Sequence, residues 1–422
     1  MTRATFTIGR WGLLLTLALA PNLMGAEVPY MDAEVYFNRG VECGRKGRYD
    51  EAISAFTKAL EINSSHADAY NNRGTAYLTK GQHDLAIADF TKALEINPRF
   101  TEAYNNRGIA HESMGQRNQA ISDYTKALEI NPRYAEAHYN RGAAYGSKGQ
   151  HDQAIVDYTR ALKINPRLAQ AYNNRGNAYE KKGLYDQAIV DLTKALEINP
   201  SYALAYYNRG YAYCGKGHYE QAIADYTRAL EINPRYAEAY SNRGAAYGRN
   251  DRHDKAIADC TKALEINPKY AEAYYNRGVA YEGKGQYDMA ISDYSKALEI
   301  NPRDAEAYYN RGTVYLSKGH HDRAISDYSK ALEINPRDAE AYANRGAAYG
   351  RKGRYDQAIF DYSKALEISP KYAEAYQNRA VAYYYLKDYD KAWEDVRKAH
   401  ELGAEIAAGF LRNLREASGR EK

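Results

Sequence analysis

The sequence predicts an all-α solenoid of eleven helix–turn–helix repeats, and three observations support that fold class. The dipeptide Asn-Arg recurs every 34 residues, at eleven places from Asn38 to Asn378. Glycine follows it in ten of these places, and only Ala380 departs from the rule. Each period also holds two short amphipathic segments that are separated by glycine and closed by helix-stopping residues. A fixed period of this length is typical of repeat architectures, in which neighbouring repeats bury the core between them.

The first 26 residues have the layout of a secretory signal peptide. Two arginines and no acidic residue precede the apolar run WGLLLTLALA over residues 11–20, and Pro21 follows it. The run is too short to span a bilayer comfortably. We therefore expect cleavage after Ala26 and export, to the periplasm or the exterior in a bacterium. An uncleaved N-terminal membrane anchor is the alternative, because Met24 is larger than the residue usual before a cleavage site.

A short linker over residues 27–32 leads into the repeats, which occupy residues 33–406. The repeats begin at residues 33, 67, 101, 135, 169, 203, 237, 271, 305, 339 and 373. In each repeat, helix A is expected over about positions 1 to 14, and a glycine at position 15, such as Gly183, can end it. Asp186 and its equivalents are predicted to cap helix B. The pair Asn199-Pro200 is predicted to stop it, because a residue before proline avoids the helical region.

The shared pattern is Y-x2-R-G-x2-Y-x8-A-x3-[YF]-x2-A-x4-P over 34 residues. It resembles the tetratricopeptide repeat family, whose pattern is W-x2-L-G-x2-Y, then A-x3-F, then P. The resemblance covers 374 of 422 residues, with all eleven repeats in phase. The sequence departs from the family in using Tyr at position 4 and Arg at position 7, as in Tyr172 and Arg175. The resemblance implies a right-handed superhelical solenoid whose A helices line the concave side.

Helix A is predicted to have two faces, and positions 4, 7, 8 and 11 form the one that packs. Gly176 at position 8 lets two helices approach closely, which offsets a loss of about 1 kcal/mol in helix propensity. Arg175 lies at the edge of this face. Position 23 is Asp in ten of the eleven repeats, and only Ala55 differs. We therefore predict a structural ion pair between Arg175 and Asp191 or the Asp of a neighbouring repeat; a solvated surface charge is the alternative.

Asparagine occupies position 6 in every repeat and is predicted to point away from the packing face. The resemblance places it in the concave groove. An amide has two donors and two acceptor lone pairs, so a row of them can hold the backbone of an extended ligand. Helices spaced about 8–10 Å apart would offer one amide to about every third ligand residue. The alternative is a structural spine, in which each Asn bonds neighbouring helix A backbone or the next Asn. The candidate peptide-binding asparagines are Asn72, Asn106, Asn140, Asn174, Asn208, Asn242, Asn276, Asn310 and Asn344.

The flanking positions indicate what kind of ligand would fit. Position 2 is acidic in nine repeats, and positions 2, 5, 6 and 9 contain no Lys or Arg. Some members of the family clamp a C-terminal carboxylate with basic groove residues, so we reject such a clamp here. A groove of Asn, Tyr and Glu favours an extended, neutral-to-basic peptide. Position 5 is a candidate ligand contact where it is Tyr, with packing between repeats or subunits as the alternative, at Tyr139, Tyr207, Tyr275 and Tyr309.

Charge and motif content argue against other functions. The net charge is +4, and without Arg3 and Arg10 of the signal segment it would be +2, from 56 basic and 54 acidic side chains. That balance is not the footprint of a nucleic-acid binder. Cys43, Cys214 and Cys260 form no CxxC pattern. The sequence contains no phosphate loop, nucleophile elbow or metalloprotease motif, so we expect no enzymatic activity, no cofactor and no metal.

The C-terminal segment, residues 407–422, is predicted to hold a closing helix that ends near Ser418, followed by a tail. A docking helix for a partner or a membrane surface is the alternative. We expect no membrane span in the mature chain. The whole sequence predicts a non-enzymatic exported scaffold or adaptor that binds a protein or an extended peptide in its groove. The alternative is a structural component of a periplasmic or envelope complex, or a self-associating solenoid, that uses its outer surface.

Overall fold

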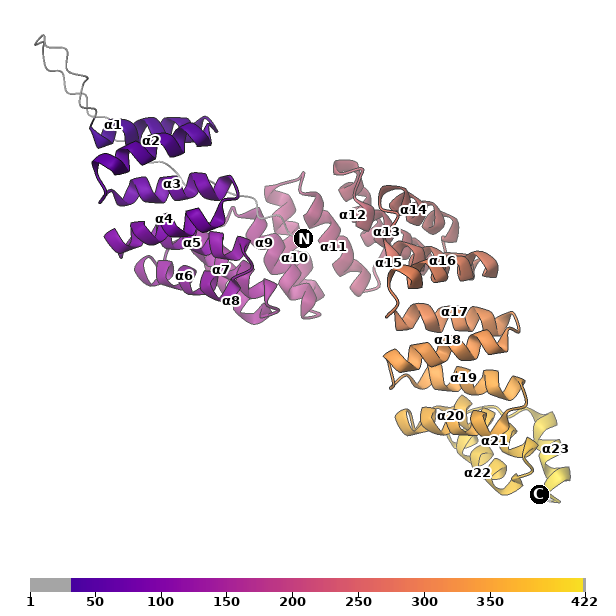
Figure 1. Cartoon of the computed structure of the whole chain (residues 1–422). Coiled ribbons are helices and arrows are strands. Elements are labelled where there is room, and N and C mark those ends of the chain that lie inside the picture. Colours follow the sequence, from indigo (N-terminus) through magenta and orange to yellow (C-terminus); the bar gives the residue numbers. More distant parts are fainter. Residues whose placement is uncertain (1–31, 420–422) are drawn as a thin grey trace, which may run out of the picture. The chain divides into compact units, whose positions relative to one another are not determined.

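The computed structural model describes residues 32–419 (Figure 1). Over these residues the chain consists of 23 α-helices and no strand. The all-α, helix–turn–helix fold class predicted from the sequence is therefore confirmed. The predicted signal peptide and its cleavage site lie outside the described residues. The chain divides between Asn131 and Pro132 into two compact bodies, which are described separately.

The first body contains three helix pairs, each formed by the helix A and the helix B of one repeat. They are α1 (Ala33–Arg45) with α2 (Tyr49–Ile62), α3 (Ala67–Thr79) with α4 (His83–Ile96), and α5 (Thr101–Ser113) with α6 (Arg117–Ile130). Each helix packs on the next one along the chain.

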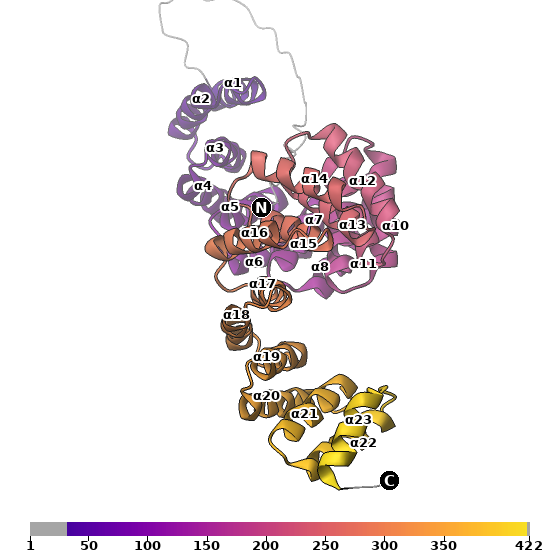
Figure 2. The same ribbon diagram turned by 90° about the vertical axis from the view of Figure 1, so that its right-hand side faces the viewer.

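The second body contains eight helix pairs and one further helix. The pairs are α7 (Ala135–Ser147) with α8 (His151–Ile164), α9 (Ala169–Lys181) with α10 (Tyr185–Ile198), α11 (Ala203–Gly215) with α12 (Tyr219–Ile232), α13 (Ala237–Arg249) with α14 (His253–Ile266), α15 (Ala271–Gly283) with α16 (Tyr287–Ile300), α17 (Ala305–Ser317) with α18 (His321–Ile334), α19 (Ala339–Arg351) with α20 (Tyr355–Ile368), and α21 (Ala373–Tyr385) with α22 (Tyr389–Glu401); α23 is Ala408–Ser418. Helices α17 to α20 show the stacking of successive pairs clearly in both views (Figures 1 and 2).

The turn between the two helices of a repeat is built on position 15. Gly183 has φ +72°, and the backbone N–H of Leu184 donates to the carbonyl of Tyr179 at 2.9 Å. A left-handed residue with such a bond is a common way to end a helix. Two repeats make the same turn without glycine, through Asp251 (φ 54°) and Lys387 (φ 61°).

The prediction that Asp186 caps helix B was wrong. Helix α10 begins at Tyr185, its N-cap residue is Leu184, and no side chain caps it. Asp186 lies instead in the first turn, where its negative charge is favourable to the helix dipole. Its carboxylate accepts a hydrogen bond from Lys216 Nζ of the next repeat at 2.6 Å. Position 18 therefore links two repeats rather than capping one helix.

The core of a repeat is built mainly of alanines, with larger side chains at position 24 and, in repeats 1 to 10, a leucine at position 28. In repeat 5 the position 24 residue is Leu192, which is fully buried against Ala188 and Ala195. A Cβ added at Gly176 would lie 2.8 Å from Leu192 Cγ. Position 8 is therefore glycine because the position 24 side chain of the same repeat occupies the space where its Cβ would be.

The one exception to the glycine rule follows from the same packing. Repeat 11 has Val396 at position 24, where most other repeats have a Tyr or Phe ring, and Ala380 at position 8. Both are buried, with exposed fractions of 5% and 0%. In repeat 11 the methyl group at position 8 therefore packs in one cluster with Val396 in place of a ring.

Helix α23 packs on α22. Leu414 is fully buried in a cluster with Val396, and the rings of Tyr384 and Phe410 meet edge to face with centroids 5.7 Å apart. Trp393 Nε1 donates a hydrogen bond to Ser418 Oγ at 3.1 Å.

Candidate functional site

Arg175 forms a fork with Asp191 of its own repeat. Its Nε and Nη2 atoms donate to the two carboxylate oxygens at 2.6 and 2.7 Å, and Asp191 is only 4% exposed. The third nitrogen, Nη1, donates at 2.9 Å to Thr159 Oγ1 in the preceding repeat. Burial disfavours the guanidinium charge, but the hydrogen bonds to Asp191 and its charge outweigh this effect and raise the pKa of Arg175.

The same arrangement recurs along both bodies. Forks with a third bond to the preceding repeat are formed by Arg73, Arg107, Arg209, Arg243, Arg277, Arg311, Arg345 and Arg379. Repeat 1 differs, because Ala55 replaces the aspartate, and Arg39 is exposed there. The arginine at position 7 is therefore structural: it closes its own repeat and ties that repeat to the one before.

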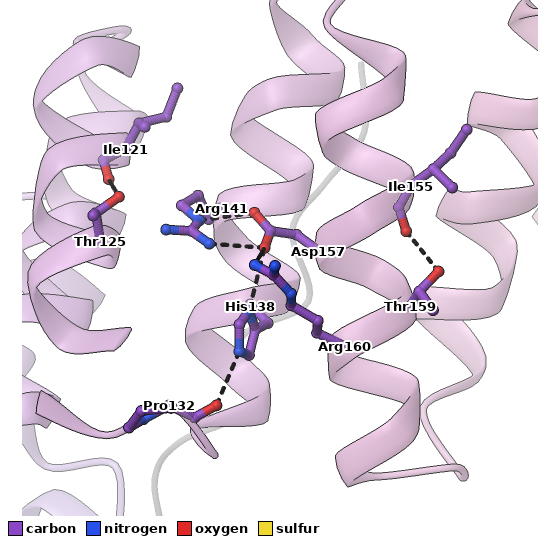
Figure 3. Close-up of polar contacts among 9 residues, drawn as sticks. All are labelled: Ile121, Thr125, Pro132, His138, Arg141, Ile155, Asp157, Thr159 and Arg160. Carbon is purple, nitrogen blue, oxygen red and sulfur yellow. Dashed lines mark hydrogen bonds and ion pairs between the residues drawn. The ribbon is translucent and has the colours of Figure 1, made fainter. Parts of the chain in front are cut away.

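One fork carries an additional donor (Figure 3). His138 stands at position 4, where the other ten repeats have Tyr. Its Nδ1 lies 3.2 Å from Asp157 Oδ1 and its Nε2 lies 3.1 Å from the carbonyl oxygen of Pro132. Burial of Asp157 disfavours its charge, but hydrogen bonds from Arg141 and His138 outweigh burial and hold the pKa of Asp157 below its ordinary value. This cluster is buried in the packing layer, so we assign it a structural role.

The asparagines at position 6 lie on the opposite side of helix A, and those of repeat 3 and repeats 5 to 10 donate to the preceding repeat. Asn174 Nδ2 donates to the hydroxyl of Tyr139 at 3.2 Å. Asn208 Nδ2 donates to Asn173 Oδ1 at 2.9 Å, and Asn173 Nδ2 donates to Asn174 Oδ1 at 3.0 Å. A continuous chain of side-chain hydrogen bonds therefore joins repeats 4, 5 and 6.

The partner is always the position 5 side chain of the repeat before. The other pairs within the bodies are Asn106 with Asn71 (3.2 Å), Asn242 with Tyr207 (2.9 Å), Asn276 with Ser241 (3.0 Å), Asn310 with Tyr275 (2.9 Å) and Asn344 with Tyr309 (2.9 Å). Asn72 accepts from Asn71 at 3.4 Å, and Asn140 lies half-buried on α7. One N–H of each of these donors is thus used inside the protein, by a contact that the sequence did not indicate.

Four of these amides keep groups that the fold does not use. Among the described residues, Oδ1 of Asn208, Asn276, Asn310 and Asn344 accepts no hydrogen bond. All four side chains are half-buried, so solvent reaches them. A second N–H and the amide oxygen of these residues remain for a ligand.

The tyrosines at position 5 also have internal contacts. The ring of Tyr207 packs on Tyr226 of its own repeat with centroids 5.8 Å apart, and Tyr139, Tyr275 and Tyr309 pack in the same way on their position 24 rings at 5.8–5.9 Å. Burial raises the pKa of Tyr275 to about 12 and that of Tyr309 to about 12, with carboxylates of the next repeat adding to the effect. These rings are half-buried, so one side of each is part of the core.

Other chemistry is sparse in the part of the chain that the structure describes. Residues 32–419 contain no group of three or more His, Cys, Asp or Glu side chains that could hold a metal ion. A shallow hollow lies at the turn of repeat 8, lined by Tyr281, Gln286, Met289 and the ion pair of Asp288 with Lys318. No helix among the described residues has the length and apolar character needed to cross a membrane.

The fold and the cross-repeat contacts define a helical-repeat scaffold in which each repeat binds its neighbours. The tetratricopeptide repeat family model matches residues 33–66, 67–100, 135–168, 169–202, 237–270, 271–304 and 339–372. Related TPR models match residues 113–149, 210–251 and 312–353, and residues 192–224, 294–326 and 362–394. The chain belongs to the tetratricopeptide repeat family, a fold used for protein interaction.

Comparisons with individual proteins show what the chain is similar to. No curated protein matches the chain. Among solved structures, the MamA protein is 33% identical with a TM-score of 0.37, over 40% of this chain and 93% of that one. YrrB, described as a TPR protein with an unusual peptide-binding site, is 27% identical with a TM-score of 0.39, over 44% and 95%. A tetratricopeptide repeat protein from Parabacteroides merdae is 24% identical with a TM-score of 0.48, over 59% and 98%.

Proposed function

We propose that this protein is an exported, non-enzymatic scaffold that binds a protein or an extended peptide along the exposed side of its A helices. The observation that carries the proposal is the row of position 6 asparagines. Asn208, Asn276, Asn310 and Asn344 each donate one N–H to the preceding repeat and keep the amide oxygen and the second N–H. Because the first bond fixes the orientation of the amide, the remaining groups are held in place before a ligand arrives.

The spacing of these groups fits an extended chain. Packed helices lie about 8–10 Å apart, and an extended peptide advances about 3.3 Å per residue. One amide then meets about every third residue of the ligand. Amides bind backbone groups of any sequence, so the row supplies affinity, and the flanking side chains supply selectivity.

The test is capture of a partner from the exported fraction of the source cell with the purified chain, read by mass spectrometry. The test variant carries Asn174→Ala, Asn208→Ala and Asn242→Ala. The matched control carries Tyr139→Phe and Tyr207→Phe, which remove the hydroxyl acceptors of two of these amides and keep the packed rings. Circular dichroism checks that both variants stay folded.

We expect the alanine variant to lose the partner and the phenylalanine variant to keep weaker binding, because its amides remain but two of them lose the bond that orients them. Equal loss in both would make the asparagines a structural spine. Capture by both would move the contact to another surface.

Export has its own test. The N-terminal signal predicts that the chain recovered from the periplasm or the medium begins at Glu27, as N-terminal sequencing would read. Recovery with Met1 intact in the membrane fraction would instead favour the uncleaved anchor.

A structural or assembly role is the second candidate, and exposed apolar side chains on the B helices favour it. Val156 and Val190 occupy position 22 in neighbouring repeats and are 49% and 62% exposed, and Phe360 at the same position is 59% exposed. Apolar side chains that lie next to one another on a surface can mark an interaction site. Analytical ultracentrifugation tests this role. Self-association would be supported if the molecular mass rises with protein concentration and if the Val190→Asp variant stays monomeric at the same concentrations.

A further inference from the structure

The exposed side of the A helices is not uniform. Among neighbouring A helices in the second body, α13 and α15 pack more closely than any other pair. Ser241, at position 5 of α13, is fully buried, and Ala245 follows at position 9. Glu238 and Glu272 stand at position 2 of these two closely packed helices.

Six residues gather there, and we refer to them as the tyrosine–glutamate cluster. They are Tyr207, Tyr211, Tyr236, Tyr270, Glu238 and Glu272. The rings of Tyr207 and Tyr236 lie 4.9 Å apart with an interplanar angle of 32°. The hydroxyl of Tyr270 donates to Glu272 Oε2 at 3.1 Å.

The six residues come from repeats 6, 7 and 8, and the glutamates also influence the tyrosines electrostatically. The pKa of Tyr207 is raised mainly by burial, and Tyr236, Glu272 and Glu238 add to the shift. Tyr270 is likewise affected by Tyr207 and by both glutamates, after burial. Both glutamates therefore raise the pKa of Tyr207 and of Tyr270, and the packing of α13 on α15 brings the helix starts that carry them together.

The cluster is open to solvent. Tyr211 is 43% exposed, and Glu238 and Glu272 are both exposed. The ring of Tyr211 already faces one cation, because Lys181 Nζ lies 5.8 Å from its centroid. Lys181 is itself paired with Glu180 at 3.3 Å, so this lysine does not neutralise Glu238 and Glu272.

We propose that the tyrosine–glutamate cluster receives an arginine side chain of the bound peptide. Aromatic faces attract a cation, and a guanidinium can stack on a tyrosine ring while its N–H groups reach a carboxylate. Two carboxylates with no basic partner of their own provide the charge complementarity. This inference rests on the proposed function, because it names the ligand class that the same surface selects.

The experiment uses the purified full chain and fluorescein-labelled glycine–serine peptides in which every third residue is arginine. Matched peptides carry lysine, glutamine or glutamate at the same places, and binding is read by fluorescence anisotropy. We expect the arginine peptide to bind about tenfold more tightly than the glutamine peptide, since each cation–π or exposed ion-pair contact contributes a factor of about two to five. Lysine should fall between them, and added salt should reduce the preference.

The key variant is Glu238→Gln with Glu272→Gln, which should reduce the ratio of arginine to glutamine binding to about twofold. Glu102→Gln is the matched control, because Glu102 has the same exposed position in repeat 3 but lies next to Phe100 and no tyrosine at position 5 precedes it. Tyr211→Ala should lower the ratio about threefold and Tyr211→Phe should leave it unchanged, because the exposed ring and not its hydroxyl makes the contact.

The outcomes separate the two proposals. If all four peptides bind equally well and binding is lost on Asn208→Ala, the amide row binds backbone and the arginine site is wrong. A tenfold ratio that survives Glu238→Gln with Glu272→Gln also overturns the arginine site. If none of the peptides binds, both the site and the proposed peptide-binding surface fail.

Discussion

Two polar side chains per repeat each belong to two repeats at once. The arginine of position 7 binds its own aspartate and a hydroxyl of the preceding repeat, as Arg175 does with Asp191 and Thr159. The asparagine of position 6 binds the position 5 side chain of the preceding repeat. The aspartate of the fork is buried, whereas Asn208, Asn310 and Asn344 are half-buried and keep free groups. The same kind of link therefore has a structural role on one side of the helix and a proposed binding role on the other.

Removing the carboxylate from one fork should destabilise that repeat strongly. Asp191→Ala leaves Arg175 with an uncompensated charge in a buried place, which costs about 3–5 kcal/mol. Native-state hydrogen exchange of α9 and α10 measures the loss locally. Asp186→Ala removes an exposed partner of Lys216 instead and should cost at most about 1 kcal/mol. Equal protection in the two variants would contradict the buried ion pair.

The histidine in repeat 4 should control the titration of its neighbour. His138→Tyr restores the residue of the other repeats and removes one hydrogen bond to Asp157, so the pKa of Asp157 should rise. A folded-state pKa below the unfolded value adds stability above the unfolded pKa, and this stability is lost as the pH falls through the folded pKa. As the pH falls, the His138→Tyr variant should therefore lose this contribution to stability at a higher pH than the parent does. Carbon-detected NMR titration of the Asp157 carboxyl reports this, and an unchanged midpoint would refute it.

Asp361 provides the internal comparison for this prediction. Its repeat has Tyr342 at position 4, and burial raises the pKa of Asp361 despite the fork with Arg345. The midpoint of Asp361 should stay the same in the His138→Tyr variant.

The sequence predicted the pairing of arginine with aspartate in each fork, but it did not predict the hydrogen-bond partners of the asparagines. The Arg–Asp pair could be predicted because both positions are nearly invariant across the repeats and their charges are opposite. The amide partner varies among Tyr, Asn and Ser, and it lies 35 residues back in the chain. That contact depends on how successive A helices stack, which the period alone does not specify. The tyrosine–glutamate cluster could not be predicted for the same reason, since it depends on the close approach of α13 and α15.

At the scale of the element, one glycine and one side chain determine how closely the two helices of a repeat pack. A Cβ at Gly278 would lie 2.8 Å from Tyr294 Cε1, and Gly176 meets Leu192 at the same distance. Repeat 11 shows the other solution, with Ala380 against Val396. The helix limits themselves were predictable, because glycine at position 15 and proline at position 32 mark them. The start of helix B was misplaced, since no side-chain cap marks it.

This pairing predicts compensation between two destabilising changes. Gly278→Ala should cost about 1–3 kcal/mol through overpacking, although alanine favours the helix by about 1 kcal/mol. Tyr294→Val should cost about 2–4 kcal/mol through a cavity. The double variant should cost less than the sum, as urea unfolding would show. Gly350→Ala is the control, because no heavy atom lies within 4 Å of the added Cβ and the change should be neutral or stabilising.

At the scale of the molecule, stability is a sum of repeats and of the contacts between neighbours. Such arrays unfold in parts, and a change in one repeat is felt mainly by the adjacent ones. The end of the second body is closed by α23, which covers α22 with Leu414 and Phe410. This helix gives the last repeat a neighbour that is not itself a repeat.

Disrupting this closure should loosen only that end. Leu414→Asp places a charge in a fully buried site and should lower hydrogen-exchange protection in α21 and α22, with α9 and α10 unaffected. Arg412→Asp, on the exposed side of the same helix, is the control and should leave protection unchanged. Loss of protection along the whole second body would show that the repeats unfold as one unit instead.

The arginine link also bears on how such a gene can change in length. Position 7 supplies a donor in every repeat, and position 25 supplies a threonine or serine acceptor in repeats 1 to 10. Any internal repeat can therefore follow any other with its link to the preceding repeat complete, so gain or loss of a whole 34-residue segment by recombination leaves no guanidinium without a hydroxyl. The two end repeats are the exceptions, since Ala55 replaces the aspartate in the first and Arg397 replaces the hydroxyl in the last. With respect to this arginine link, the interior repeats are thus interchangeable and the two end repeats are not.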